Sequence, residues 1–175
     1  MCIRDSAGTP LEGNDTHFPP GIQTYPGGEF EKHLKPFEAA FDVGVASVMP
    51  YYSIPHGITS EDVGAAYNKE IITGLLRERY DFQGIICTDW ATITDLKPLG
   101  IIFKPASAHG VEHLNTDQRL KKLFNAGIDM IGGESLSNEL SELVNKDEIS
   151  LTRIDESVKR IMKQKFQLGL FDNPY

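Results

Sequence analysis

The sequence predicts an α/β fold built on a parallel sheet. Three short apolar segments begin near residues 46, 84 and 128, and at least one helical pattern follows each of them. Alternation of strands and helices along a chain is typical of parallel sheets. The segments begin 38 and 44 residues apart, whereas a complete eightfold barrel averages ~30 residues per unit over ~250 residues. We therefore expect about three strand–helix units, either as a small open sheet or as part of a barrel.

The composition indicates an ordinary globular chain. The 175 residues are 40% hydrophobic and 24% charged, and 17 Lys and Arg against 25 Asp and Glu give a formal net charge of −8. This apolar content excludes a disordered chain. No apolar run approaches the ~18 residues of a membrane span. The acidic balance argues against a nucleic-acid partner, and Cys2 and Cys87 are too few for a disulfide scaffold.

The first 28 residues show no clear helix or strand pattern. Residues 1–6 lack the apolar core of a secretory signal and start no element that the next residues continue. We therefore expect residues 1–6 to be a non-native leader. Pro and Gly are too dense between Ala7 and Gly28 for a regular element, which predicts a loop. A loop of this length is usually functional or disordered.

The middle of the chain predicts a helix, a strand and a second helix. The first helix is expected over 35–41, with Pro36 in its first turn, where a missing N–H costs nothing. Residues 46–49 are a candidate buried strand, which ends in a polar, Pro-containing loop over 50–57. Asn68 is expected to cap the next helix, whose apolar positions follow the rhythm of one buried face.

The next segment carries the second strand and its helix. Residues 84–88 are apolar without alternation, which is typical of a parallel strand covered on both faces, and the strand ends at Asp89. Thr116 is expected to cap a helix that Gly127 closes. A third strand is predicted over 128–131.

Two further helices are predicted near the C-terminus. Ser137 opens the first, and Thr152 begins the second with Asp155 in a variant capping box. Gly169 is expected to end that helix. Residues 173–175 are interpreted as the start of a linker.

Candidate chemistry lies where the strands end, because ligands of parallel α/β folds bind beyond the carboxyl ends of strands. Asp89 directly follows an apolar strand, and a carboxylate there must be solvated or paired, since burying it alone is too costly. Trp90 offers a flat apolar face that suits a sugar or an aromatic ligand. Spacing alone leaves open that Asp89 only caps the next loop.

The segment Ile85–Trp90 resembles the (Ser/Thr)-Asp-Trp segment of glycoside hydrolase family 3, the β-glucosidase family. Five further segments resemble the family in the same order along the chain: 48–52, 69–77, 126–131, 154–161 and 168–171. The resemblance covers nearly everything from Ala7 onward. Taken together these segments are specific, although (Ser/Thr)-Asp-Trp alone would not be.

The resemblance implies a partial (β/α)8 TIM-type barrel over residues 7–172, made of roughly its last three βα units. It implies a retaining, exo-acting β-glycosidase that hydrolyses β-linked glucosides or xylosides. Asp89 would be the nucleophile that forms a covalent glycosyl-enzyme. Trp90 and Tyr52 would border the sugar, and Glu134, which follows the third strand, would reach the pocket or lie at its rim.

The same resemblance sets the expected partners. These are a carbohydrate substrate and a second, C-terminal α/β domain absent from this chain, while no cofactor and no metal are expected. It also suggests a periplasmic or secreted protein. With five barrel units missing, open strand edges would leave the chain poorly stable and inactive on unactivated substrates.

Two departures from the family concern sugar binding and proton transfer. The family's Lys-His pair precedes a Gly-rich turn whose tail Ala7-Gly8 resembles, so that pair would lie upstream of this chain. In most of the family the general acid comes from the second domain, but an N-acetylglucosaminidase branch uses an Asp-x-His dyad. Asp15-Thr16-His17 has that spacing, so Asp15 and His17 are either this acid/base or loop residues near the sugar.

Two other classes of protein stay open at this stage. Trp90 and Tyr52 would also suit a non-catalytic sugar-binding remnant. Residues 109–113 read His-Gly-Val-Glu-His, an inverted zinc-protease pattern. A zinc site needs a helix that places His109 and His113 on one side, and Gly110 argues against one.

Overall fold

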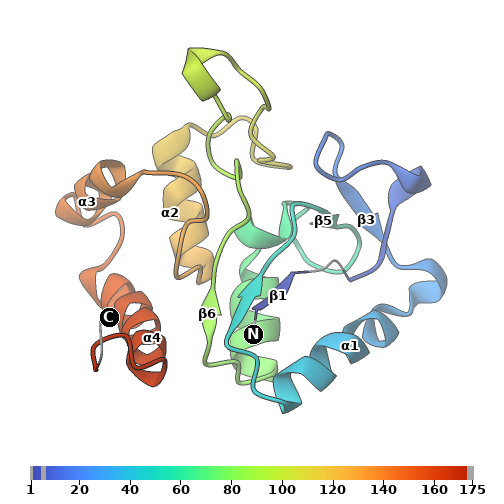
Figure 1. Cartoon of the computed structure of the whole chain (residues 1–175). Coiled ribbons are helices and arrows are strands. Elements are labelled where there is room, and N and C mark those ends of the chain that lie inside the picture. Colours follow the sequence, from blue (N-terminus) through green and yellow to red (C-terminus); the bar gives the residue numbers. More distant parts are fainter. Residues whose placement is uncertain (1, 5–6, 173–175) are drawn as a thin grey trace.

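The computed structural model describes residues 2–4 and 7–172. Figure 1 shows short strands at the centre, with α1 (Phe30–Asp42) on one side and three helices on the other. Those helices are α2 (Thr116–Ala126), α3 (Ser137–Asn145) and α4 (Leu151–Gln167). The predicted mixture of helices and parallel strands is therefore confirmed.

The central sheet is parallel and has the order β1 (Cys2–Arg4), β4 (Ser47–Met49) and β6 (Ile85–Ile86). The predicted third strand over 128–131 is shorter than expected, with a single parallel bridge between Cys87 and Met130. The Thr88 N–H still donates to the Met130 carbonyl at 2.9 Å. The segments near 46, 84 and 128 therefore lie side by side in sequence order.

The N-terminal 28 residues differ from the prediction in two places. The leader was expected to start no element, yet Cys2–Arg4 pairs with Ser47–Met49 as β1. The non-native origin of residues 1–6 stays a prediction. The stretch expected to be a loop contains four short elements: β2 (Thr9–Pro10), η1 (Leu11–Gly13), β3 (Ile22–Thr24) and η2 (Pro26–Gly28).

A second small sheet explains why this segment has regular structure. β3 pairs antiparallel with β2 and parallel with β5 (Ile54–Pro55). The parallel partner of β3 is β5, at residues 54–55, some thirty residues further along the chain. The local content of Pro and Gly therefore does not reveal this pairing. Long-range pairing therefore orders part of the predicted loop. We call residues 9–24 the flap.

The first helix begins earlier than predicted. It runs from Phe30, so Pro36 lies inside α1 and not in its first turn. Phe30, Leu34, Phe37 and Phe41 share one apolar face across Pro36. Burying that face, with Leu34 only 4% exposed, offsets the backbone hydrogen bond that proline removes, because packing supplies most of the stability of a helix in a protein.

The helix beginning after Asn68 is confirmed with its cap. The Asn68 Oδ1 accepts the N–H groups of Glu70 and Ile71 at 3.0 and 3.2 Å. The helix, η4 (Glu70–Arg79), has the wider turns of a π-helix. A 3-10 turn, η3 (Ala65–Tyr67), precedes it, and another, η5 (Pro98–Gly100), forms the tip of a projecting loop (Figure 1).

The predicted caps of α2 and α4 are wrong by one and two residues. Asn115, not Thr116, caps α2 through a reciprocal capping box with Gln118, and Ser150, not Thr152, caps α4. Both true caps have extended backbone, which aims the side-chain oxygen at the N–H three residues on. Gly127 closes α2 as predicted, at φ 114°.

The core lies between the central sheet and the surrounding helices. Its least exposed side chains come from η3, η4, β6, α2, the loop after Asp89 and the segment after α2: Ala65, Ile72, Ile86, Ile93, Leu120, Leu123 and Ile128. No helix within residues 2–4 and 7–172 is long and apolar enough to cross a membrane.

Candidate active site

Asp89 lies where the chain leaves the central sheet after β6. The residue is 7% exposed. Its Oδ1 accepts the backbone N–H of Trp90 at 2.7 Å, and its carbonyl accepts the Thr92 hydroxyl at 2.8 Å. Asp89 thus does cap its own turn, as the simpler interpretation expects, and this contact also sets the orientation of the carboxylate.

The turn after Asp89 is tightly constrained. Ala91 has φ 52°, in the left-handed region that non-glycine residues rarely adopt. Gly133 packs so closely on Trp90 that a Cβ there would lie 1.8 Å from the indole Cδ1. The Thr88 hydroxyl accepts the N–H of Gly132 at 2.8 Å. The Gly-Gly turn after the third strand therefore supports the indole, which is itself 54% exposed.

Tyr52 connects Trp90 to the N-terminal flap. Its buried hydroxyl donates to the Trp90 carbonyl. The His17 ring meets the Tyr52 ring edge-on, with centroids 5.1 Å apart, and the Lys104 Nζ lies 4.2 Å from the Tyr52 ring centroid. The structure therefore brings together three of the candidate site residues, Trp90, Tyr52 and His17. It adds Lys104, which no sequence pattern indicated.

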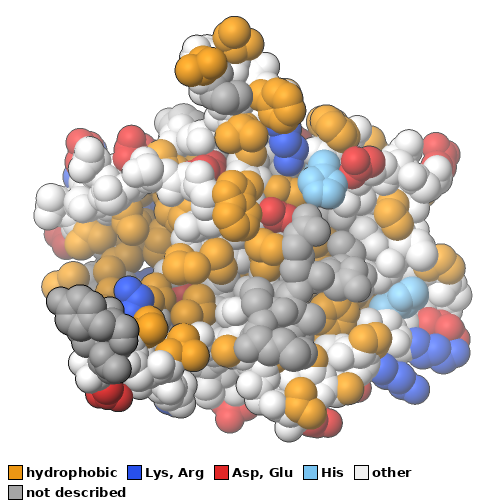
Figure 2. Space-filling model, in the orientation of Figure 1, with side chains coloured by type: hydrophobic (Ala, Val, Ile, Leu, Met, Phe, Trp, Pro, Cys, Tyr) orange, Lys and Arg blue, Asp and Glu red, His pale blue; other side chains and the backbone are white. Residues whose placement is uncertain are grey.

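Asp15 and His17 form a hydrogen-bonded pair at the rim of this site. The His17 Nδ1 lies 2.6 Å from the Asp15 Oδ1, which also accepts the His17 backbone N–H at 2.9 Å. The backbone bond, and then the imidazole, lower the pKa of Asp15 from its ordinary value. An ionised Asp15 accepts only, so the Nδ1 of His17 carries the proton. Figure 2 shows histidine, basic and acidic side chains grouped near the top of this face.

Glu134 faces the loop after Trp90. Its Oε1 accepts the N–H groups of Ile93 and Thr94 at 3.0 and 2.6 Å and the Thr94 hydroxyl at 3.0 Å. Arg119 also donates to the Ile93 carbonyl at 2.8 Å. The contacts of Glu134 therefore shape the loop that follows Asp89.

Comparison with known proteins decides the family. Residues 14–164 match the model of the glycosyl hydrolase family 3 N-terminal domain, which is most of the chain.

The chain belongs to glycosyl hydrolase family 3.

Two curated relatives and two solved structures illustrate this relationship. The family 3 chain is 49% identical over 170 residues to β-glucosidase C of Emericella nidulans, covering 96% of this chain and 27% of that protein. It is 40% identical over 156 residues to a periplasmic β-glucosidase/β-xylosidase of Dickeya chrysanthemi, covering 82% and 24%. The chain therefore spans about a quarter of the length of these relatives.

The structural matches extend over most of the family 3 chain. A β-glucosidase from Listeria innocua matches with a TM-score of 0.64 at 26% identity, covering 81% of this chain and 18% of that one. A β-glucoside phosphorylase matches with a TM-score of 0.76 at 19% identity, covering 98% and 31%. At that identity the second match shows the fold alone.

In this family 3 chain, the two histidines of the zinc-protease pattern at residues 109–113 have different surroundings. His109 is 1% exposed, and its Nε2 lies 3.0 Å from the Thr16 carbonyl, while His113 is exposed. Residues 109–113 form turns and no helix. Within the described part of the chain, no group of three or more His, Cys, Asp or Glu side chains could hold a metal ion.

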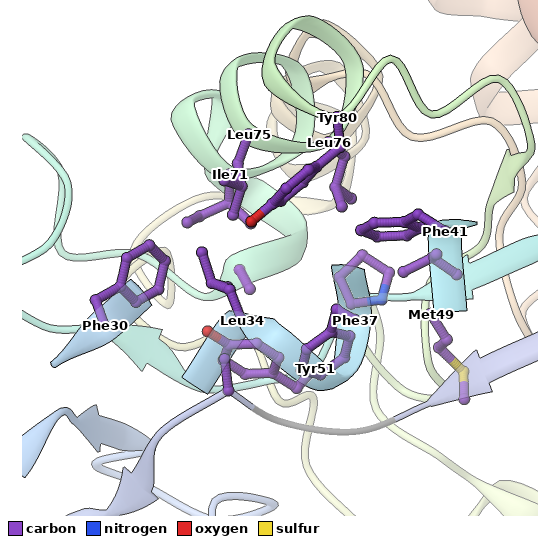
Figure 3. Close-up of a pocket in the computed structure, with 14 residues that line it drawn as sticks. Phe30, Leu34, Phe37, Phe41, Met49, Tyr51, Ile71, Leu75, Leu76 and Tyr80 are labelled. Carbon is purple, nitrogen blue, oxygen red and sulfur yellow. The ribbon is translucent and has the colours of Figure 1, made fainter. Parts of the chain in front are cut away.

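An apolar pocket of about 50 Å³ lies away from this site, between α1 and η4. Figure 3 shows side chains of both helices, such as Phe41 and Leu76, pointing toward one another across it. Small-molecule pockets usually enclose roughly 300–1,000 Å³ and offer a few polar groups. This pocket of the family 3 chain is therefore a packing gap and not a sugar site.

Proposed function

We propose that this chain is the nucleophile-bearing part of a retaining, exo-acting β-glycosidase that hydrolyses β-glucosides or β-xylosides. The observation that carries the proposal is the place of Asp89, at the carboxyl end of a parallel strand beside an exposed Trp90. The names of the relatives, β-glucosidase and β-glucosidase/β-xylosidase, support this substrate class.

We propose that residues 7–172 form about three units of a (β/α)8 barrel and that residues 173–175 begin a linker. The sheet order supports this, because β4, β6 and the segment at 128–131 are parallel neighbours in sequence order. In such a barrel the active site lies at the carboxyl ends of the strands. Asp89 and Tyr52 both lie just beyond such ends. The rest of the barrel and a second α/β domain would complete the site.

In the proposed reaction Asp89 attacks the anomeric carbon while the bond to the leaving-group oxygen breaks. A carbon–oxygen bond to Asp89 forms, and the leaving group takes a proton from a general acid. Water then attacks the anomeric carbon, gives its proton to the same group, and releases Asp89. Trp90 and Tyr52 would supply the apolar faces on which the sugar ring packs.

The Asp15–His17 pair is the candidate acid/base within this chain. The 2.6 Å contact holds the imidazole. Its ring contact with Tyr52, which we propose to border the sugar, supports this role. The other source of the acid is the second domain that the resemblance implies. The pair also supports a second candidate function, an N-acetylglucosaminidase, although the relatives' names favour a glucosidase.

The test replaces Asp89 by glycine in the longer protein to which we propose this chain belongs. Turnover of an aryl β-glucoside should fall almost completely, and azide should restore release of the aryl alcohol by forming the α-glycosyl azide. Asp155→Asn, at an exposed position of α4, is the matched control. Unchanged turnover after Asp89→Gly would refute the assignment of Asp89 as the nucleophile.

A second measurement separates the enzyme from a sugar-binding remnant. The 175-residue chain is mixed with an aryl β-glucoside whose leaving group needs little acid help. A burst of aryl alcohol would contradict the remnant, because binding alone breaks no bond. Sugar binding by calorimetry without any burst would favour it.

A further inference from the structure

The segment after the projecting loop holds the flap that carries Asp15 and His17. The Ser107 hydroxyl donates to the His17 carbonyl at 2.9 Å. The His109 Nε2 lies 3.0 Å from the Thr16 carbonyl, and because a carbonyl only accepts, this nitrogen carries the proton. Ser107 and His109 are 2% and 1% exposed. Two buried donors therefore bind consecutive carbonyls of the Asp-Thr-His segment.

The His109 ring lies directly on the backbone of the flap. A Cβ at Gly21 would be 2.3 Å from the His109 Cδ2, so the ring leaves no room for a side chain there. Gly21 has φ 61°, which glycine adopts without strain. The ring is thus wedged between residue 21 and the Thr16 carbonyl, at the end of the flap next to β3.

Ser107 and His109 are themselves fixed to the scaffold. The Ser107 N–H donates to the Ala91 carbonyl at 2.7 Å, and the His109 carbonyl accepts the N–H of Gly64 at 2.9 Å. Gly110 packs so tightly that a Cβ would lie 2.3 Å from the Asp62 carbonyl oxygen. The two donors therefore connect an exposed flap to the turn that carries Asp89 and to the buried start of η3.

We propose that Ser107 and His109 are positioning residues that hold the Asp15–His17 pair at the sugar site for proton transfer to the leaving group. The inference rests on the proposed function. Asp15 and His17 are about half exposed, with side-chain exposures of 60% and 42%, so their own burial does little to fix them. Proton transfer requires hydrogen-bond reach, and small displacements cost large factors in rate.

The test compares substrates that differ in their need for acid. The longer protein is assayed with phenyl β-glucoside, whose leaving group must be protonated, and with 2,4-dinitrophenyl β-glucoside, whose leaving group departs without a proton. His109→Leu and Ser107→Ala should lower kcat/KM on the phenyl substrate by about 10²-fold. On the dinitrophenyl substrate we expect at most about a threefold loss, because that bond breaks without general acid catalysis.

Conservative variants supply the matched controls. His109→Gln keeps an N–H donor and Ser107→Thr keeps a hydroxyl, so both should recover most of the phenyl activity. Asp15→Asn and His17→Ala should show the same discrimination between the two substrates. If His109→Leu fails to fold, Ser107→Ala carries the test, because it removes a single oxygen atom.

The outcomes separate this inference from the proposed function. Equal losses on both substrates in folded variants would indicate a purely structural role and overturn the inference. If the Asp15 and His17 variants lose no more activity on the phenyl substrate than on the dinitrophenyl substrate, the inference is also overturned. The proposal that Asp89 is the nucleophile would be unaffected. A wild-type protein with no turnover of either glucoside or of the matching aryl β-xylosides would overturn both proposals.

Discussion

The sharpest stability prediction concerns Asp129, a carboxylate at the base of the central sheet. Its side chain is 0% exposed and meets three guanidinium groups, a hydroxyl and a backbone N–H. The distances are 2.5 Å to Arg77, 2.9 Å to Arg160, 3.4 Å to Arg153, 3.0 Å to the Ser157 hydroxyl and 3.0 Å to the Ile86 nitrogen. This single anion therefore joins η4, β6 and α4.

Asp129→Asn should remove the charge that balances these cations. The three arginine side chains are only 12–23% exposed, so water replaces the lost partner poorly. Breaking a buried ion pair in this way costs about 3–5 kcal/mol. With a urea dependence of about 2 kcal/mol per M, the midpoint of unfolding should fall by about 2 M.

Urea denaturation of the chain, followed by far-UV circular dichroism, measures this shift. Glu142→Gln is the control, because its pair with Lys146 is solvent-exposed and contributes about 0.5 kcal/mol or less. Ser157→Ala removes one hydrogen bond to the carboxylate and should cost about 1.5–3 kcal/mol. The effect of Ser157→Ala remains measurable even if Asp129→Asn unfolds the chain without urea. An Asp129→Asn midpoint close to that of the control would refute the reasoning.

Three further predictions concern the site and its surroundings. Gly133→Ala should shift the fluorescence of Trp90, the single tryptophan, because the new Cβ would occupy the indole's place. Gly28→Ala is the control, because Gly28 has φ 68° and open surroundings. It should lower the free energy of unfolding by about 1 kcal/mol without any spectral shift. Burial lowers the pKa of His109 from 6.5, so the unfolded state binds the proton first as the pH falls. The free energy of unfolding should therefore decrease below about pH 6.5, by at most about 1.4 kcal/mol per pH unit, and His109→Gln should flatten this dependence in urea titrations. Glu134→Ala should lower the free energy of unfolding by about 2–3 kcal/mol, since its carboxylate accepts bonds from the loop after Trp90, and a loss no larger than that of Glu134→Gln would contradict this role.

Much of the fold follows from local patterns in the sequence. The strand predicted over 84–88, which the structure has as Ile85–Ile86, and the helix after Asn68 were predictable because an apolar run and a side-chain cap act on adjacent residues. Helix starts were less accurate where two polar residues compete, as with Asn115 and Thr116, since backbone conformation decides which one caps. The flap at 9–24 was missed because its strand partner lies at 54–55.

The candidate site, too, was predictable only where local sequence sets the position of a residue. The places of Asp89, Trp90 and Tyr52 just beyond apolar strands could be predicted from the sequence, while their roles in catalysis and sugar binding stay predictions. Lys104 could not, because an exposed loop with no periodic pattern brings it over the Tyr52 ring. The contacts of Ser107 and His109 with the flap span about ninety residues of chain. The only pattern that the sequence offered around His109 was a zinc-protease one, which Gly110 already argued against.

The sequence by itself determined the parallel α/β class, the strand end that presents Asp89, and the resemblance to a glycosidase family. These follow from hydrophobic periodicity and short motifs, whose physics acts over a few neighbouring residues. Only the tertiary structure decided which distant side chains meet around Tyr52 and the flap: the Asp15–His17 pair, Lys104, and the two donors that hold the flap. Hydrogen bonds and ring contacts between remote segments depend on how the chain packs, and packing depends on every segment at once.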